Sequence, residues 1–253
     1  MMKTNKAFTL IELLVVISII ALLIGILLPA LGAARRTARQ MQNSTQIRGI
    51  HTALVLFSQG NNTYYPGLTT KGKILAAAAI YAAGDQNTTA DETGAAVGLR
   101  FRELLEDNYF TGEYAVSPSE TKTRWAGSGN EVTALNLSYA MLQITTTGKR
   151  DNEWRDTSNS EAVVLSDRAK THATGKVKSV HTNPSGTTNE WRGSVGFNDN
   201  HVTFEATHDQ LNLQYGDSSI TADNLFDNSD ANTLSVTSND APMVFDGTSS
   251  MIE

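Results

Sequence analysis

The first sixty residues contain one long apolar block. Residues 13–28 (LLVVISIIALLIGILL) carry no charge, and Phe8–Leu31 extends the block to 24 residues with Glu12 as its only ionisable group. About 20 such residues are enough for a helix to cross a bilayer. Gly25 and Pro29 are compatible with this, because transmembrane helices tolerate both when neighbouring groups satisfy the freed backbone. The pattern therefore predicts a membrane-spanning helix over residues 8–31.

A helical pattern continues beyond the apolar block. Apolar side chains recur there at intervals of three and four, and they are Ala34, Ala38, Met41, Ile47, Ile50, Leu54 and Phe57. This spacing is typical of one face of an amphipathic helix. Gly60 and the two asparagines after it give a stop signal. We predict that the helix continues to about Ser58, so that residues 32–60 form an amphipathic continuation able to pack on a soluble domain.

The pattern changes to shorter runs after residue 60. A second helix is predicted at 99–110, and strand-like runs follow at 132–145, 162–166, 177–181, 194–197 and 201–205. The last two runs flank Asn198-Asp199-Asn200, and their apolar side chains alternate as a β-hairpin requires. A helix followed by mostly antiparallel strands indicates an α+β fold. We expect the long N-terminal helix to pack on a mostly antiparallel β-sheet domain that spans residues 61–253.

The charges of the chain are distributed unevenly. All 20 Lys and Arg of the 253 residues lie at or before Arg192, together with 16 acids, whereas the last 61 residues hold ten acids and no base. Nucleic-acid binding needs a basic face, so we expect no nucleic-acid partner. The acidic C-terminal region is expected to be solvated or to face cations. The absence of cysteine excludes disulfides and thiol chemistry.

Clustered oxygen groups in this acidic region are candidate calcium ligands. Asp223, Asp227 and Asp230 alternate with asparagines, and calcium takes six to eight oxygen ligands from flexible loops. The spacing matches no EF-hand, and the same composition also marks solvated turns. Calcium is therefore the one cofactor considered, without an assigned ligand set.

The sequence shows no catalytic constellation. Neither an HExxH nor a GxSxG motif occurs, and the five histidines, at positions 51, 172, 181, 201 and 208, lack a metal-ligand spacing on a predicted helix. Surface histidines are the expected interpretation. We therefore predict that the protein is not an enzyme.

The start of the chain carries a specific processing motif. Residues 6–14 (KAFTLIELL) combine a short basic leader, a small residue, Ala7, before the aromatic Phe8, and a lone glutamate, Glu12, five residues into the mature chain. With Pro29 late in the apolar helix, this motif resembles the processing site of type IV pilins and type II secretion pseudopilins. Ala7 stands where that family usually has glycine. The long apolar block and its carboxylate distinguish it from a cleaved secretory signal.

The resemblance implies a pilin fold and a set of roles. Residues 1–7 would be a leader that a prepilin peptidase removes between Ala7 and Phe8, methylating the new amine. Assembly would involve Phe8, Glu12, Gly25 and Pro29, with Glu12 pairing the Phe8 ammonium of a neighbouring subunit and the stretch 25–29 able to unwind. A first-turn carboxylate that favours the helix N-terminus and a self-pair within one subunit are the alternatives for Glu12. The major pseudopilins also bind calcium near their C-termini.

The expected partners follow from the same resemblance. They are further copies of the chain in a homopolymeric filament, the prepilin peptidase, an inner-membrane assembly platform, and membrane lipid before assembly. The chain is expected in the inner membrane with its N-terminus in the cytoplasm and its body outside, and then in a periplasmic or cell-surface filament. Lys3 and Lys6 favour this orientation, whereas Arg35, Arg36 and Arg39 oppose it. A surface pilus and a secretion pseudopilus both fit. A membrane-tethered binding protein or enzyme is the alternative.

The body resembles, more weakly, long pilin-like proteins with a prepilin-type N-terminus. The points of likeness are Ser117-Pro118-Ser119, Ser138-Tyr139, residues 163–167 (VVLSD), His181 and residues 197–202 (FNDNHV). We interpret them as structural rather than catalytic.

Overall fold

The computed structural model describes residues 9–75, 96–127, 132–144, 153–169, 171–173, 176–182, 191–208, 225–226 and 243–245. The chain divides into two compact units, Met1–Met41 and Gln42–Glu253. The described part of the first unit is helical from Leu10 onward, whereas the second unit contains the hydrophobic core.

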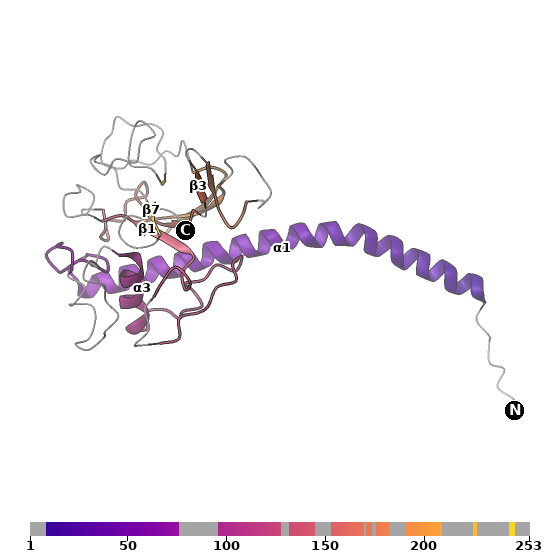
Figure 1. Ribbon diagram of the computed structural model, residues 1–253, viewed down its shortest axis with the longest axis horizontal. Coiled ribbons are helices and arrows are strands. Elements are labelled where there is room, and N and C mark those ends of the chain that lie inside the picture. Colours follow the sequence, from indigo (N-terminus) through magenta and orange to yellow (C-terminus); the bar gives the residue numbers. More distant parts are fainter. Residues whose placement is uncertain are drawn as a thin grey trace, which may run out of the picture. The chain divides into compact units, whose positions relative to one another are not determined.

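Helix α1 runs from Leu10 to Gly60, 51 residues, and confirms the predicted long helix (Figure 1). It continues without a break through Pro29. Its buried positions begin at Asn43, whereas Ala34, Ala38 and Met41 are exposed. The predicted stripe was therefore wrong in its first half, because periodicity identifies a face of a helix but not whether that face has a partner.

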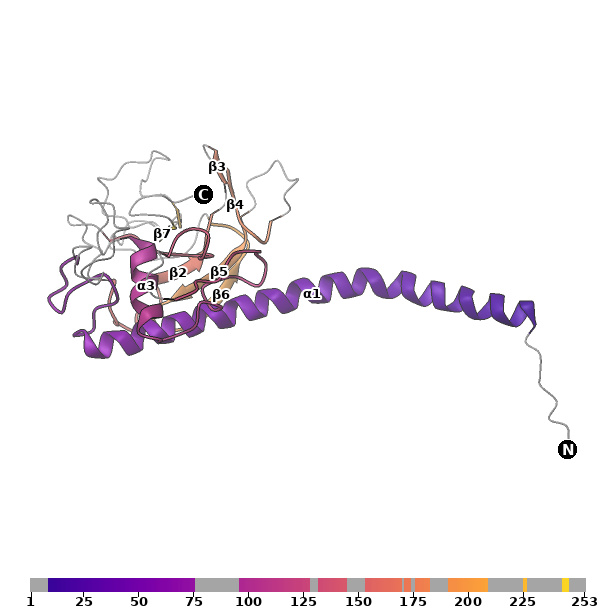
Figure 2. The same cartoon turned by 60° about the horizontal axis from the view of Figure 1, so that its bottom comes forward.

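A five-stranded antiparallel sheet forms the centre of the second unit, with strand order β6-β5-β2-β1-β7 (Figure 2). Its strands are β1 (Tyr139–Leu142), β2 (Val163–Asp167), β5 (Gly193–Phe197), β6 (Val202–Glu205) and β7 (Met243–Val244). A separate pair consists of β3 (Thr171–Ala173) and β4 (Lys176–Lys178). The arrangement of a long helix on an antiparallel sheet confirms the α+β class and matches the pilin fold.

The predicted hairpin is confirmed, whereas the first predicted strand is shorter than expected. β5 and β6 pair in register around residues 198–200, and Asn200 takes the left-handed conformation, with φ 70°, that this turn needs. In the described part of the run 132–145, which ends at residue 144, only Tyr139–Leu142 is a strand. Asn136 explains the difference, because its Oδ1 accepts the Thr133 N–H at 3.2 Å and closes a turn within the run.

The core forms where the last turns of α1 meet the sheet. Ile47, Ile50 and Leu54 are fully buried. A Cβ atom on Gly196 of β5 would lie 2.5 Å from Cγ2 of Ile47, so glycine is required for the helix to approach this strand so closely. The contact between Ile47 and Gly196 therefore sets how closely the helix approaches the sheet at this point.

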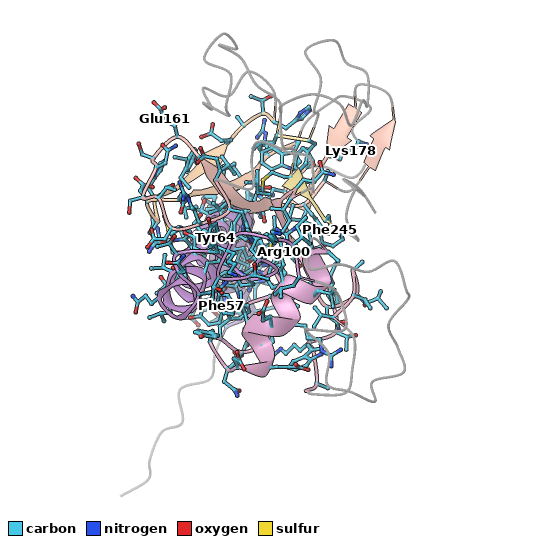
Figure 3. All side chains as sticks on the ribbon, turned by 90° about the vertical axis from the view of Figure 1, so that its left-hand side faces the viewer. Phe57, Tyr64, Arg100, Glu161, Lys178 and Phe245 are labelled. Carbon is cyan, nitrogen blue, oxygen red and sulfur yellow. The ribbon has the colours of Figure 1, made fainter. Side chains whose placement is uncertain are left out.

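Helix α3 (Val97–Glu106) lies beside the C-terminal end of α1 (Figures 1 and 2) and confirms the second predicted helix, although it ends four residues early. Its Arg100 is fully buried (Figure 3). The guanidinium donates from Nη1 to the Leu142 carbonyl oxygen at 2.8 Å and lies 4.7 Å from the ring centroid of Trp154. Burial lowers the pKa of Arg100 to about 9.

The acidic C-terminal region also contributes to the core. Leu225, Phe226, Met243 and Phe245 are each at most 1% exposed, and Met243 belongs to the edge strand β7. The expectation of a solvated region is therefore wrong for these residues. Met243 and Phe245 belong to a short apolar run, residues 242–245 (PMVF), that stands among the aspartates of this region.

Candidate processing and assembly segment

A capping box lies at the start of the apolar part of α1. The Glu12 Oε2 atom accepts hydrogen bonds from the Thr9 backbone N–H at 2.8 Å and from Thr9 Oγ1 at 2.7 Å. In return, Thr9 Oγ1 accepts the Glu12 N–H at 3.3 Å. This reciprocal pairing over Thr-x-x-Glu satisfies backbone donors that a helix start leaves open. The carboxylate therefore has a partner within its own chain.

The apolar part of α1 is exposed along its whole length. The helix is long and apolar enough to cross a membrane, and the residues of its most apolar stretch are all exposed. Gly25 has no atom within 4 Å of where a Cβ would stand, and Pro29 lies inside the helix. The predicted unwinding of residues 25–29 concerns a filament, and it stays a prediction.

Several predicted site residues lie outside the described part of the chain. They are Ala7 and Phe8 at the predicted cleavage site and the calcium candidates Asp223, Asp227 and Asp230. Among the described residues no group of three His, Cys, Asp or Glu is placed to hold a metal ion. Calcium binding and the cleavage position therefore stay predictions.

A buried polar cluster fixes α1 to the sheet in the second unit. Asn43 is fully buried, and its Nδ2 lies 2.9 Å from both carboxylate oxygens of Asp167. Its Oδ1 accepts hydrogen bonds from Ser117 Oγ at 2.7 Å and from the Tyr139 hydroxyl at 3.0 Å. We call this group the Asn43 cluster, and its members are Asn43, Gln46, Ser117, Tyr139, Asp167 and Ser194.

The buried carboxylate of Asp167 is the centre of the Asn43 cluster. Besides Asn43, it accepts the Ser194 backbone N–H at 2.6 Å. Nε2 of His181 lies 3.2 Å from Oδ2 of Asp167, although the pair is not aligned as a hydrogen bond. Burial, followed by the charges of Asp167 and Glu120, raises the pKa of Tyr139 well above its usual value. Tyr139 is therefore a neutral donor.

The structure brings together residues that the weaker resemblance named only as separate points. Ser117, Tyr139, Asp167 and His181 come from four segments and meet around the amide of Asn43 or the carboxylate beside it. Asn43 itself was missed. A signal was present, because position 43 precedes Ile47, Ile50 and Leu54 at helical spacing, and a polar amide on an apolar stripe needs a partner.

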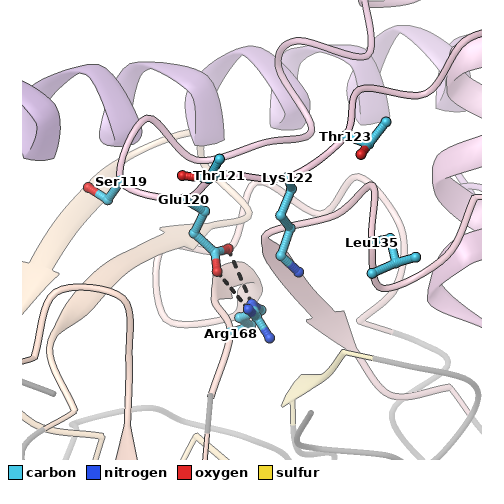
Figure 4. Close-up of a pocket in the computed structure, with 7 residues that line it drawn as sticks. All are labelled: Ser119, Glu120, Thr121, Lys122, Thr123, Leu135 and Arg168. Atoms are coloured by element: carbon cyan, nitrogen blue, oxygen red, sulfur yellow. Dashed lines mark hydrogen bonds and ion pairs between the residues drawn. The ribbon is translucent and has the colours of Figure 1, made fainter.

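A small polar cavity of about 440 Å³ lies beside the sheet (Figure 4). A salt bridge lines it, in which Arg168 Nη2 lies 2.6 Å from Glu120 Oε1 and both side chains are 3% exposed. Burial raises the pKa of Glu120, but the hydrogen bonds and the positive charge of Arg168 outweigh burial and lower the pKa overall. The other lining residues are Ser119, Thr121, Lys122, Thr123 and Leu135.

The expectation of surface histidines is wrong for three of the five. His51 and His208 are 2% and 4% exposed, and the His181 side chain is 4% exposed. Each packs on an aromatic ring, namely Tyr65, Phe226 and Phe204 respectively. Burial lowers the pKa of His51. Since an imidazole ring has an apolar body, aromatic neighbours far along the sequence can bury it.

The N-terminal segment matches one family model. Residues 2–28 match the prokaryotic N-terminal methylation motif. No curated protein and no solved structure matches the chain. The prepilin-type motif and the long apolar helix are consistent with a type IV pilin-like or pseudopilin-like protein that is made as a membrane-anchored precursor.

Proposed function

We propose that this protein is a structural, non-enzymatic subunit of a pilus or pseudopilus filament. The observation that carries the proposal is the methylation motif at residues 2–28 on a helix whose apolar half is exposed. Such a surface is stable in a bilayer, or in a bundle of identical helices that replaces the bilayer. The precursor would be held with its N-terminus in the cytoplasm and then polymerise through α1.

The proposed processing separates the leader from the filament subunit. A prepilin peptidase would cleave between Ala7 and Phe8 and methylate the new amine, which keeps its positive charge. Thr9 would then be the second residue of the mature chain, so the capping box with Glu12 would be retained.

Electron microscopy of sheared cell-surface and periplasmic material, with mass spectrometry of the subunit's N-terminus, tests this proposal. We expect filaments whose subunit begins at a methylated Phe8. An assembled chain that still starts at Met1, or one cut near Ala34, would contradict the processing step. If the cleaved protein stays monomeric in the membrane under conditions of active secretion, the proposal that it forms filaments is contradicted.

The alternative is a membrane-tethered binding protein. The polar cavity at Glu120 and Arg168 is the observation that favours it, because a ligand site needs a concave surface with a few polar groups. Lys122→Ala and Thr121→Ala would impair the cellular function of a tethered binder while leaving α1 unchanged. A filament subunit would assemble normally with both substitutions.

A further inference from the structure

Three arginines follow the apolar block of α1 without any acid near them in the helix. Arg35, Arg36 and Arg39 lie within five residues, and Glu12 is the only acid between Leu10 and Gly60. All three side chains are exposed, and the described residues include no hydrogen bond or ion pair of their guanidinium groups. The helix therefore presents three positive charges with no carboxylate of its own to pair them.

Their backbone positions lie in the headgroup layer of a bilayer and just beyond it. From Leu10 to Leu31 the helix rises about 32 Å at about 1.5 Å per residue, close to the roughly 30 Å of a hydrocarbon core. Arg35 and Arg39 then lie about 6 and 12 Å beyond Leu31. Side chains on a helix lean towards its N-terminus, so these guanidinium groups reach back towards the membrane.

The three arginines also share one side of the helix. At about 100° per residue, Arg36 and Arg39 lie roughly 100° and 40° from Arg35 around the axis. Arg48 lies on the other side, about 220° away and roughly 20 Å further along. Three of the four arginines of α1 therefore lie on one side of the helix, within about 6 Å along its axis.

Because these charges would stand on the translocated side, they oppose insertion unless a partner compensates for them. From this geometry we infer that Arg35, Arg36 and Arg39 bind the phosphate groups of anionic phospholipids in the leaflet that faces the body of the protein. The planar guanidinium matches phosphate oxygens in a bidentate way. The inference rests on the proposed membrane-anchored precursor and adds the partner that fixes its depth before assembly.

Leader removal makes this contact more important. Lys3 and Lys6 lie in residues 1–7 and leave with the leader, so the arginine cluster then contains every remaining Lys and Arg within the first 47 residues. The lipid contact would hold the cleaved subunit at one axial level. Entry into a filament would release the lipids.

Spin-labelled lipids test the inference on the full-length chain in vesicles of phosphatidylcholine. The measurement compares how strongly labelled phosphatidylglycerol and labelled phosphatidylcholine associate with the protein. We expect a preference for phosphatidylglycerol of roughly fivefold for each arginine at low salt, decreasing in 0.5 M salt. Arg35→Gln/Arg36→Gln/Arg39→Gln should abolish the preference. The matched control Arg48→Gln should keep it, and Arg→Lys at the three positions should retain most of it.

The other outcomes separate this inference from the proposed function. Insertion with equal association of both lipids, or a preference that survives the triple glutamine variant, overturns the inference alone. Failure of the wild-type chain to enter vesicles overturns the membrane anchor as well. Crosslinking between copies of the chain in pure phosphatidylcholine, where no anionic lipid is present, is a further test. If the wild-type chain crosslinks and the triple glutamine variant does not, the arginines bind the acidic C-terminal region of a second copy rather than lipid.

Discussion

At the scale of single residues, the buried amide of Asn43 links α1 to four other segments of the second unit. Its Nδ2 donates to the carboxylate of Asp167, and its Oδ1 accepts hydrogen bonds from two hydroxyl groups. Asp167 is 1% exposed, and a buried carboxylate is tolerated only when hydrogen bonds replace water. Asn43 therefore specifies which face of the helix meets the sheet, in addition to stabilising the contact.

Replacing Asn43 should destabilise the second unit strongly. We expect Asn43→Ala to lower the free energy of unfolding by about 2–4 kcal/mol, because the Asp167 carboxylate loses donors that water cannot replace. Urea denaturation of the fragment 34–253, followed by tryptophan fluorescence, measures the change. The neighbouring exposed Gln42→Ala should stay within about 0.5 kcal/mol of the wild type. A similar small effect for Asn43→Ala would show that the Asn43 cluster does not contribute to stability.

Glu103 should make the stability depend on pH. Burial raises its pKa to about 7; the hydrogen bond from the Gly67 N–H opposes this, and the charge of Asp107 adds to it. The folded state then binds the proton more tightly than the unfolded state, so the free energy of unfolding falls as the pH rises from about 4.5 to about 7. The free energy of unfolding can fall by at most about 3 kcal/mol over this range. Solvent screening at this half-buried group makes the expected fall smaller.

Glu103→Gln should remove that pH dependence, because the neutral amide oxygen can still accept the Gly67 N–H. Urea titrations of the fragment 34–253 at pH 4.5, 6 and 8 should show the variant gaining stability over the wild type as the pH rises. The exposed Glu161→Gln is the control and should follow the wild-type profile. Parallel profiles for wild type and Glu103→Gln would contradict the raised pKa.

At the scale of elements, the approach of α1 to β5 depends on Gly196. A Cβ there would stand 2.5 Å from Ile47 Cγ2, and the two residues belong to the packed elements α1 and β5. We expect Gly196→Ala to cost about 1–3 kcal/mol through overpacking. Ile47→Ala should cost about 2–5 kcal/mol by itself. The double variant should lose less than the sum, because Ile47→Ala removes the clashing atom.

A double-mutant cycle by thermal or urea denaturation gives the coupling energy. A coupling of about 0.5–3 kcal/mol fits direct contact. Gly60→Ala is the matched control, since nothing lies within 4 Å of the position that its new methyl group would take, and little change is expected. Simple additivity of Gly196→Ala and Ile47→Ala would mean that the helix and strand are not in contact as described.

The last turns of α1 should be essential for folding of the second unit. Ile47, Ile50 and Leu54 are fully buried, and each contributes about 1.5–3 kcal/mol. That sum approaches the roughly 5–15 kcal/mol of a typical domain. We expect the fragment 42–253 to unfold cooperatively and the fragment 61–253 to show no cooperative transition by calorimetry. A fragment from Ala34 should melt like the one from Gln42, because residues 34, 38 and 41 are exposed. Equal melting of 42–253 and 61–253 would contradict this account.

The elements themselves show what a sequence can predict. The long helix, helix α3 and the β5–β6 hairpin follow from local periodicity and turn residues, and all three are confirmed. β7 has two residues and pairs with β1 about a hundred positions earlier, so no local pattern marks it. The position of Asn43 on the apolar stripe indicated a buried amide, but its hydrogen-bond partners lie 74 to 151 residues away and could not be identified from local pattern. The processing site depended on motif resemblance rather than on periodicity.

At the scale of the whole molecule, the two units differ in how they satisfy their apolar surface. The second unit contains a buried hydrophobic core, whereas the described apolar residues of the first unit are exposed, Leu10 at 79% and Leu31 at 49% among them. A surface of that kind is stable only in lipid or against other helices. The first unit thus requires an environment outside its own chain, and its one acid, Glu12, must be stable in that environment too.

Glu12→Gln separates two explanations of that acid. As a helix-capping residue, Glu12 would be replaced without loss, because glutamine also suits the capping box with Thr9. If Glu12 instead pairs with the Phe8 ammonium of a neighbouring subunit, the substitution abolishes the pairing, because glutamine has no charge. We expect Glu12→Gln to insert and to be cleaved normally but to fail to enter filaments. Filament yield at equal membrane abundance measures the effect.

Thr9→Val is the complementary variant, because it removes the Oγ1 hydrogen bonds and keeps the Glu12 charge. Loss of the cap should cost about 0.5–2 kcal/mol of helix stability, an effect that packing in a helix bundle can offset. We therefore expect Thr9→Val to assemble at a yield near wild type. The reverse result, with filaments from Glu12→Gln and none from Thr9→Val, would assign Glu12 to the helix start and leave intersubunit charge pairing without support. If Glu12 pairs with the Phe8 ammonium of its own subunit, neither variant should affect assembly, because that pairing does not stabilise a contact between subunits.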